Sequence, residues 1–439
     1  MAEIFKAYDI RGVYPADVNF AVAEKIGRAY VCFSGARKVV VGRDMRPHSQ
    51  ELFDGLCAGL LAQGASVIDL GLCSTPQSYF ANGTLKADGS IMITASHNPG
   101  EWNGFKLCLA NAVPISGATG IMDIKKLVER DQWQDAPQPG KLSRYDIGPE
   151  YGAFLRSFAV PGARKLKVVC DFANAMGMYE IAGIRDLFDV VPMYDTLDGT
   201  FPNHEANPLK TETLTAICQK VRETGADFGA AFDGDADRCG FIDDLGQIIP
   251  MDLFTALIAQ DILSRGPATI LYDLRSSRAV PECIRANGGK AIQSRVGHAF
   301  IKAQMRENNA VFAGELSGHY YFKQNFTAES QGLAMVMLSN LIGRKNRPLH
   351  DLIAPLKKYF SSGEINSKVA DVKPILLELK KRYADGNLYE LDGISSEYPN
   401  WWFNVRASNT EPLLRLIVEA DTKELMEAKR DELLSIIRR

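Results

Sequence analysis

The sequence lacks paired cysteines of the kind that bind zinc or exchange disulfides. Its eight cysteines stand singly, and Cys57, Cys108 and Cys170 lie inside apolar runs. Buried, reduced thiols are typical of proteins kept in a reducing compartment. The spacing therefore predicts a cytoplasmic protein without a cysteine-based metal or redox site.

Three further features are absent. The formal net charge of -3 provides no basic excess for binding nucleic acid. No apolar run is long enough to span a bilayer. The first residues, Met-Ala-Glu-Ile-Phe-Lys, lack the basic-then-apolar pattern of a signal peptide. We therefore expect neither nucleic acid nor membrane as a partner.

What the chain does contain is typical of a globular protein with several domains. Its 439 residues are 46% hydrophobic and 23% charged, too long for a single core. Strand and helix patterns alternate as far as about residue 361, which predicts helix-covered α/β sheets. The last part has mostly strands and two helices, which predicts a smaller α+β domain. The expected boundaries are 1–145, 146–250, 251–361 and 362–439.

Three local expectations concern the first domain. Residues 5–12 have the composition of a polar turn rather than of a strand. Asn103 and Gly104 predict a second turn, with a strand from Phe105 to Leu109. Residues 131–144, rich in proline and poor in apolar side chains, are typical of a linker.

Ser96 lies in Thr-Ala-Ser-His-Asn-Pro, directly after the apolar strand Ile91 to Ile93. The motif predicts a tight loop that presents a hydroxyl group between two strands, with Lys106 able to return to it. A serine in such a loop is more often a turn former or a helix cap than a catalytic group. On its own the motif favours that structural interpretation.

Asp233, Asp235 and Asp237 alternate with small residues after the apolar strand 227–232. Three carboxylates this close repel one another unless a hard cation lies between them, which predicts a Mg²⁺ site. A calcium EF-hand is one alternative, but its sixth position should be glycine and is Arg238. A haloacid-dehalogenase-type nucleophile and an acidic surface loop are the others.

Two later loops are rich in polar groups. Arg406-Ala-Ser-Asn-Thr concentrates hydrogen-bond donors that suit a phosphate dianion, and Arg415 offers a second cation. Gly-Glu315-Leu-Ser-Gly-His319 combines groups that recognise sugar hydroxyls, although it could be an ordinary glycine-rich turn. His298 could titrate near neutral pH, or cap the helix that follows it.

Together, and in this order, these four loops resemble those of the α-D-phosphohexomutase superfamily. The resemblance covers nearly the whole chain, with one motif in each domain. It implies three similar mixed-sheet α/β domains and a smaller C-terminal α+β domain around a central cleft. It also implies hexose phosphates as substrates, Mg²⁺ as cofactor and a hexose 1,6-bisphosphate as activator. The oligomeric state, monomer or homodimer, stays open.

The resemblance also assigns roles to residues. It implies that Ser96 carries a phosphoryl group, and that Mg²⁺ is bound by Ser96, Asp233, Asp235 and Asp237. The positions around the transferring phosphoryl group are Arg11, Lys106, Arg238, His298 and His319. The resemblance also implies that Glu315 and Ser317 bind the sugar hydroxyls. The residues that it assigns to the non-reacting phosphate are Arg406, Ser408, Asn409, Thr410 and Arg415.

Within the family, the serine loop and the opening Tyr8-Asp-Ile-Arg-Gly are similar to the bacterial phosphomannomutase/phosphoglucomutase branch. This favours an isomerase acting on mannose phosphate, with glucose phosphate as a second substrate. Phosphoglucosamine mutase is the nearest alternative. A sugar-phosphate binding protein without catalytic activity is the alternative from another class.

Overall fold

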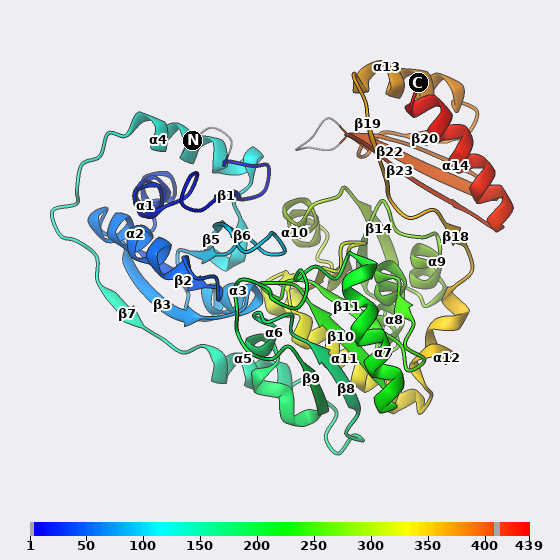
Figure 1. The fold of residues 1–439 in the computed structure, drawn as a ribbon, viewed down its shortest axis with the longest axis horizontal. Helices are drawn as coiled ribbons and strands as arrows, with labels where there is room; N and C mark the ends of the chain where they lie inside the picture. Colours follow the sequence, from blue (N-terminus) through cyan, green and yellow to red (C-terminus); the bar gives the residue numbers. More distant parts are fainter. Residues whose placement is uncertain (1–3, 408–412) are drawn as a thin grey trace.

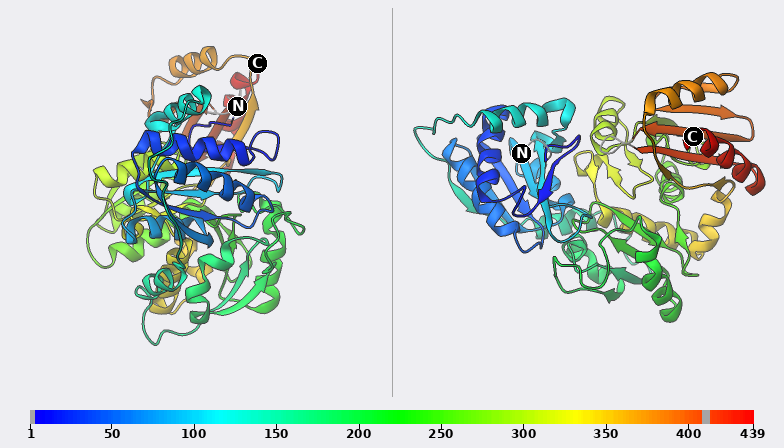
Figure 2. Two further views of the ribbon diagram at one scale, coloured as in Figure 1. Left: turned by 90° about the vertical axis from the view of Figure 1, so that its left-hand side faces the viewer. Right: turned by 45° about the horizontal axis from the view of Figure 1, so that its top comes forward.

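A computed structural model describes residues 4–407 and 413–439. Four sheets follow one another along the chain, each with its own helices. The first three lie in an arc, and the fourth lies beyond the third, reached through one extended segment (Figures 1 and 2). None of the described helices combines the length and the hydropathy needed to cross a membrane. The architecture is the expected one, three mixed α/β units and a smaller C-terminal unit.

The first sheet has the order β1-β5-β4-β2-β3-β7, with β6 beside β5. Strands β2, β3, β4 and β7 form parallel pairs, whereas β5 pairs antiparallel with β4, β1 and β6. The strands are β1 (Ile10–Val13), β2 (Lys38–Arg43), β3 (Ser66–Leu72), β4 (Gly89–Ile93), β5 (Trp102–Leu109), β6 (Val113–Pro114) and β7 (Leu142–Arg144). The helices are α1 (Phe20–Ser34), α2 (Ser49–Ala62), α3 (Thr75–Thr84) and α4 (Met122–Arg130).

The three local expectations for this unit were wrong in part. Part of the expected turn at residues 5–12 is strand β1, and part of the expected linker is strand β7. Asn103 and Gly104 lie inside β5 rather than in a turn. Gly104 serves the pairing instead, because a Cβ there would lie 2.0 Å from the carbonyl oxygen of Ile10 on β1.

The second and third sheets have one topology. Their orders are β12-β11-β10-β8-β9 and β14-β13-β15-β16-β17, with parallel pairs at one end and an antiparallel hairpin at the other. The second unit contains α5 (Gly148–Arg156), β8 (Lys167–Asp171), α6 (Gly177–Glu180), β9 (Asp189–Met193), α7 (Thr215–Thr224), β10 (Phe228–Phe232), β11 (Cys239–Ile242) and β12 (Ile248–Ile249).

The third unit repeats this arrangement with two added helices at its end. It contains α8 (Met251–Leu263), β13 (Thr269–Asp273), α9 (Ala279–Ala286), β14 (Lys290–Ser294), α10 (His298–Glu307), β15 (Phe312–Gly314), β16 (Tyr320–Phe322), β17 (Ala328–Glu329), α11 (Gln331–Lys345) and α12 (Leu349–Ile353). The core of the first sheet, β3-β2-β4-β5, has the same pairing directions. The structural repeat is therefore present although no sequence repeat is visible.

The fourth sheet is antiparallel throughout, in the order β18-β23-β22-β21-β20 with β19 beside β23. Its elements are β18 (Phe360–Ser361), β19 (Ile365–Lys368), α13 (Val372–Arg382), β20 (Asn387–Tyr389), β21 (Ile394–Tyr398), β22 (Trp401–Ala407), β23 (Leu413–Ala420) and α14 (Lys423–Ile437). One apolar core runs through the first three units, from Val40 through Phe232 to Phe322, and the first unit has a second core that includes Ile26 and Phe105. The fourth unit has its own core, which includes Phe403 and Leu433.

Glu180, which is fully buried, joins the first three units. Its carboxylate accepts hydrogen bonds from Ser74 Oγ (2.6 Å), Tyr151 Oη (2.7 Å) and the backbone N–H of Gly332 (2.8 Å). Burial raises the pKa of Glu180 to about 7, although these hydrogen bonds act in the opposite direction. The junction of the three units therefore contains an acid that titrates near neutral pH.

Candidate active site

The Ser96 loop follows β4, where the first sheet changes from parallel to antiparallel pairing. Ser96 is buried and has a φ of 53°, in the left-handed region that non-glycine residues seldom adopt. Its N–H donates to Thr94 Oγ1 at 2.9 Å. The loop thus fixes one hydroxyl group in a strained backbone conformation.

Arg46 holds the loop from behind. Its buried guanidinium donates to four backbone carbonyl oxygens, those of Ser96 (3.0 Å), Asn98 (2.7 Å), Pro99 (2.5 Å) and Trp102 (2.9 Å). Asp44 balances its charge at 3.1 Å. Carbonyl groups of a buried irregular loop need such donors, and a guanidinium has enough of them for all four.

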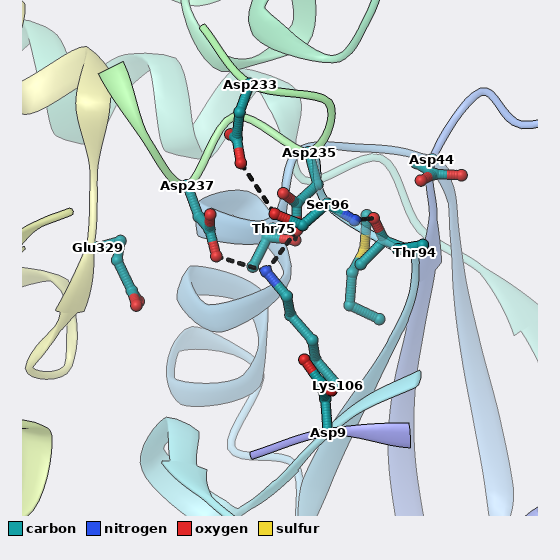
Figure 3. Close-up of polar contacts among 12 residues, drawn as sticks. Asp9, Asp44, Thr75, Thr94, Ser96, Lys106, Asp233, Asp235, Asp237 and Glu329 are labelled. Atoms are coloured by element: carbon teal, nitrogen blue, oxygen red, sulfur yellow. Dashed lines mark hydrogen bonds and ion pairs between the residues drawn. The ribbon is translucent and has the colours of Figure 1, made fainter. Parts of the chain in front are cut away.

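The acidic loop occupies the equivalent position in the second sheet, between β10 and β11. Asp233, Asp235 and Asp237 are all buried there, and Ser96 Oγ donates to Asp233 Oδ2 at 2.9 Å (Figure 3). The loops approach closely because residue 234 has no side chain. A Cβ at Gly234 would lie 2.3 Å from the carbonyl oxygen of Ser96. The hydroxyl and the carboxylates, 137 residues apart, form one site.

Helix α3 positions the middle carboxylate. Thr75, its first residue, donates to Asp235 twice, from N–H to the backbone oxygen at 2.9 Å and from Oγ1 to Oδ2 at 2.6 Å. A helix N-terminus presents N–H donors and a positive partial charge to the anion. The first domain therefore supplies part of the electrostatic environment of the acidic loop.

Lys106, on β5, extends into the same loop. Its ammonium group lies 2.5 Å from Asp235 Oδ2 and also contacts Asp237 (Figure 3). Burial alone would lower the pKa of Lys106, but Asp235 and Asp237 outweigh it and raise the pKa above its ordinary value. Lys106 is therefore a charged group beside Ser96, not a free base.

The three carboxylates fit a divalent cation. One ligand atom from each lies within 4.8 Å of the others. Among the described residues, Oδ1 of Asp235 and of Asp237 has no hydrogen-bond partner although both atoms are buried. Burial and the two neighbouring carboxylates raise the pKa of Asp233, whereas burial of Asp237 is outweighed by Lys106 and His319, which lower its pKa. An all-oxygen site with unsatisfied acceptors suits a hard ion such as Mg²⁺.

Two arginines flank the serine and the carboxylates. Arg11, on β1, donates to the carbonyl of Ala95 (3.2 Å) and to Asn98 Oδ1 (2.7 Å), with Asp9 as its ion partner at 2.7 Å. The backbone N–H of Arg238 donates to Asp233 Oδ1 at 3.1 Å. The Nε atom of Arg238 lies 3.9 Å from Asp233 Oδ2, so both guanidinium groups are close to the serine loop or the acidic loop.

The third equivalent loop, between β15 and β16, brings Glu315, Ser317 and His319. Ser317 Oγ and Glu315 Oε2 lie 2.9 Å and 3.3 Å from His319 Nδ1. The other ring nitrogen lies 3.4 Å from Asp237 Oδ1 and 3.2 Å from Arg238 Nε. Burial lowers the pKa of His319, yet the two carboxylates outweigh it and raise the pKa to about 9. His319 therefore connects the second and third loops, and its raised pKa favours the charged ring, which donates to the carboxylates, over the neutral ring that could accept from Arg238 Nε.

His298 stands apart from this network. It is the first residue of α10, and Gly297 is the N-cap, so His298 does not cap the helix. Its half-buried ring packs edge-on against Tyr8 at 5.6 Å. Burial and the positive charges of Lys302 and Lys106 hold the pKa of His298 well below its usual range. At pH 7 this imidazole is neutral.

Arg406 and Arg415 face each other in register on β22 and β23. Glu364 contacts both, accepting from Arg406 Nη2 at 2.8 Å and from Arg415 Nη1 at 3.3 Å. Arg275 of the third unit lies 3.6 Å from Glu364 and 3.9 Å from Glu315. These contacts connect the fourth unit with the Glu315 loop. Ser408, Asn409 and Thr410 lie outside the described residues.

Several residues of the site were not identified from the sequence. The set comprises Arg46, Thr75, Arg275 and Glu364. Arg275 follows the end of β13, and a search of all polar residues after strands would have found it. Arg46 also follows a strand, β2, but the four carbonyl groups that it binds lie at least 50 positions away along the chain. Glu364 has no such signal, because its partner Arg406 lies 42 positions away.

Four sequence profiles of one family match the chain in order. They describe the alpha/beta/alpha domains I, II and III and the C-terminal domain of phosphoglucomutase/phosphomannomutase. The matched residues are 2–135, 150–246, 250–359 and 364–436. Each of the four loops lies within a different one of these matches.

Whole proteins and a solved structure agree with the profiles. A phosphomannomutase from Methanocaldococcus jannaschii is 41% identical, over 99% of this chain and 97% of that protein. A phosphomannomutase from Escherichia coli is 39% identical, over 99% of each. The crystal structure of a phosphoglucomutase/phosphomannomutase family protein from Burkholderia thailandensis superposes with a TM-score of 0.91 at 32% identity, over 99% of this chain and 97% of that one.

Proposed function

The chain belongs to the phosphoglucomutase/phosphomannomutase family and is a hexose phosphate mutase, and from this premise we propose how its residues perform the reaction. The favoured substrate is mannose phosphate, since the similar proteins from M. jannaschii and E. coli are phosphomannomutases. Glucose phosphate is the second substrate. The observation that carries the mechanism is the 2.9 Å contact between Ser96 Oγ and Asp233.

In this mechanism Ser96 carries a phosphoryl group. The P–O bond to Ser96 Oγ breaks as a P–O bond forms to the free hydroxyl oxygen of the hexose phosphate, giving a hexose 1,6-bisphosphate. The hydroxyl proton passes to a base, and Ser96 Oγ takes up a proton as its bond to phosphorus breaks, so that Ser96 becomes a free hydroxyl group. After the bisphosphate turns end over end, its other phosphoryl group returns to Ser96, and the opposite isomer is released. Trace hexose 1,6-bisphosphate maintains the phosphorylated state of Ser96.

Positioning and charge neutralisation are what such a transfer needs most. Mg²⁺, held by Asp233, Asp235, Asp237 and an oxygen on Ser96, supplies neutralisation of negative charge when bound. Lys106, Arg11 and Arg238 add fixed positive charge around Ser96. His319 is charged as well. His298 is neutral, so its imidazole could accept the proton of the substrate hydroxyl.

The remaining contacts select the sugar phosphate. Glu315 is suited to accept hydrogen bonds from sugar hydroxyls, and Ser317 is suited to donate hydrogen bonds to them. Arg406 and Arg415, with Ser408, Asn409 and Thr410, are assigned to the phosphate that does not react. Since the intermediate must bind in both orientations, this phosphate site must open and close again. We expect the fourth domain to move when substrate binds, which small-angle scattering with and without substrate would detect as a change in radius of gyration.

The decisive assay measures Mg²⁺-dependent conversion of mannose 1-phosphate, glucose 1-phosphate and glucosamine 1-phosphate, each with trace hexose bisphosphate. Turnover of the first two supports the proposal. Preference for glucosamine 1-phosphate would identify a phosphoglucosamine mutase instead. Binding without turnover of any of the three would leave only a sugar-phosphate binding protein.

The domain boundaries, the cytoplasmic location and the oligomeric state, monomer or homodimer, stay predictions. Size-exclusion chromatography with light scattering measures the last of these directly. Limited proteolysis tests the boundaries, because cleavage is expected first near residues 145 and 361, in the segments that connect the expected domains.

A further inference from the structure

Glu364 lies where the chain passes from the third unit to the fourth, between β18 and β19. The preceding Gly363 has a φ of +65°, which lets the backbone turn sharply there. The turn directs the half-buried Glu364 carboxylate toward three guanidinium groups. These belong to Arg406 at 2.8 Å, Arg415 at 3.3 Å and Arg275 at 3.6 Å.

The three arginines come from two units. Arg406 and Arg415 are cross-strand partners on the fourth sheet, while Arg275 follows a strand of the third sheet. Asp273 and Glu315 also pair with Arg275, at 2.6 Å and 3.9 Å. Among the described residues, Glu364 is the one carboxylate that forms ion pairs with arginines of both the third and the fourth unit.

The environment of Glu364 is that of a bound anion. Partial burial alone would raise the pKa of its carboxyl, but the charges of Arg275, Arg406 and Arg415 outweigh burial and lower the pKa. The carboxylate is therefore ionised at neutral pH. Two planar carboxylate oxygens that meet guanidinium donors reproduce part of what a phosphate group presents.

We propose that the Glu364 carboxylate competes with the non-reacting phosphate of the substrate for Arg406 and Arg415. When the phosphate binds, it replaces Glu364 as the hydrogen-bond acceptor of these two guanidinium groups. The inference rests on the proposed function, which assigns these arginines to that phosphate. It adds a residue that sets how tightly the phosphate is held.

The need for such a residue follows from the reaction. A cluster of partly buried arginines without a resident anion would hold a phosphate dianion tightly and release it slowly, because uncompensated buried charge is unfavourable. The bisphosphate must leave this cluster before it can turn over. With Glu364 present, the guanidinium groups regain a partner as the phosphate departs. Glu364 lies in the segment between β18 and β19, where the chain passes from the third unit to the fourth. Binding of phosphate to Arg406 and Arg415 is therefore also coupled to the position of the fourth domain.

The test compares Glu364→Gln with the parent chain in two assays. Equilibrium binding of mannose 1-phosphate is measured by calorimetry in a Ser96→Ala background, where no turnover occurs. Steady-state kinetics are measured with Ser96 intact. We expect the Glu364→Gln change to lower Kd by about three- to tenfold and to lower both KM and kcat, since one competing charge is removed.

Two further variants make the result specific. Glu364→Asp keeps the charge and should return Kd toward the parent value. Glu390→Gln removes an exposed carboxylate of the same unit, paired with Lys380, and should leave Kd and kcat unchanged. Circular dichroism spectra and melting temperatures check that each variant is folded.

The outcomes separate the inference from the proposed function. An unchanged or raised Kd in Glu364→Gln overturns the role of Glu364, provided that Arg406→Ala weakens binding. If Arg406→Ala binds mannose 1-phosphate as tightly as the parent, the phosphate site itself is misassigned and the inference falls with it. A lower Kd together with a lower kcat in Glu364→Gln, reversed by Glu364→Asp, supports both.

Discussion

Gly234 and Ser96 are in backbone contact across two domains: a Cβ at residue 234 would lie only 2.3 Å from the carbonyl oxygen of Ser96. The acidic loop can reach the serine loop only because this position has no side chain. The first two sheets bring their equivalent loops together in this way, and the proposed catalysis depends on how closely these loops approach.

Gly234→Ala should therefore impair catalysis without altering any polar group. The added methyl group must push the two loops apart, so we expect kcat to fall about a hundredfold and stability to fall by about 1–3 kcal/mol. Gly343→Ala is the matched control, since a Cβ at this exposed helical position meets nothing within 4 Å. It should keep full activity and melt at the same or a slightly higher temperature. If both variants had the same kcat and the same stability, the absence of a side chain at residue 234 would not be what allows the two loops to approach.

Ser96→Ala removes the proposed phosphoryl carrier. We expect normal folding and retained binding of sugar phosphate, with kcat reduced by at least roughly a thousandfold, because no other hydroxyl lies at Asp233 in the described structure. Intact-mass spectrometry should show that the parent, but not the variant, gains one phosphoryl group from hexose bisphosphate. Near-normal turnover in the variant would refute the proposed mechanism.

Arg46→Lys tests the support of the serine loop. A lysine ammonium cannot satisfy four carbonyl groups that lie around a guanidinium, so Ser96 should be less well positioned. We expect kcat to fall about 10- to 100-fold while Mg²⁺ affinity stays close to that of the parent. Arg37→Lys, at an exposed position of the same unit, should have no effect. Equal loss of metal affinity and kcat would point to general misfolding instead.

Mg²⁺ binding should release a proton near pH 7. Burial and the neighbouring carboxylates raise the pKa of Asp233, so part of the metal-free protein holds a proton that the cation must displace. Mg²⁺ affinity should accordingly rise with pH through this region. Calorimetry in two buffers with different ionisation enthalpies measures the proton directly. The buffer dependence should vanish in Asp233→Asn, and heats that are equal in both buffers for the parent would disprove the expectation.

Glu180 should make stability depend on pH. Its pKa is raised from 4.5 to about 7 in the folded protein. The folded state thus binds more protons than the unfolded state between these values, and its free energy of unfolding falls as pH rises from about 4.5 to 7. The full difference is on the order of 3 kcal/mol at 1.36 kcal/mol per pKa unit.

Glu180→Gln removes this titration, and its amide can still pair with Ser74, Tyr151 and Gly332. Denaturation by urea at pH 5 and pH 8 is the measurement. The variant should gain stability relative to the parent at pH 8 but not at pH 5. A constant difference between the two proteins at both pH values would show that Glu180 does not titrate as described.

The sequence predicted those features that depend on local pattern. Asp233, Asp235 and Asp237 follow an apolar strand of small residues, and Ser96 follows another, so each loop could be found by itself. It could not predict β1, because a four-residue strand with a central glycine has the composition of a turn. Nor could it predict Arg46 or Glu364, whose functions arise only when distant segments fold together.

The division of the apolar cores has a further consequence. Because one core runs through the first three units, none of them can be removed or replaced without exposing the interior of the others. The fourth unit has its own core and contacts the third mainly through polar groups such as Arg275 and Arg278, so we expect that it can be exchanged if these contacts are kept. A chimera that carries the fourth unit of another family member, from the strand that corresponds to β18 onward, would exchange the segment that we propose to bind the non-reacting phosphate, while keeping this chain's Ser96 loop and acidic loop. Substrate range could thus evolve at one end of the molecule while the transfer chemistry stays constant at the other.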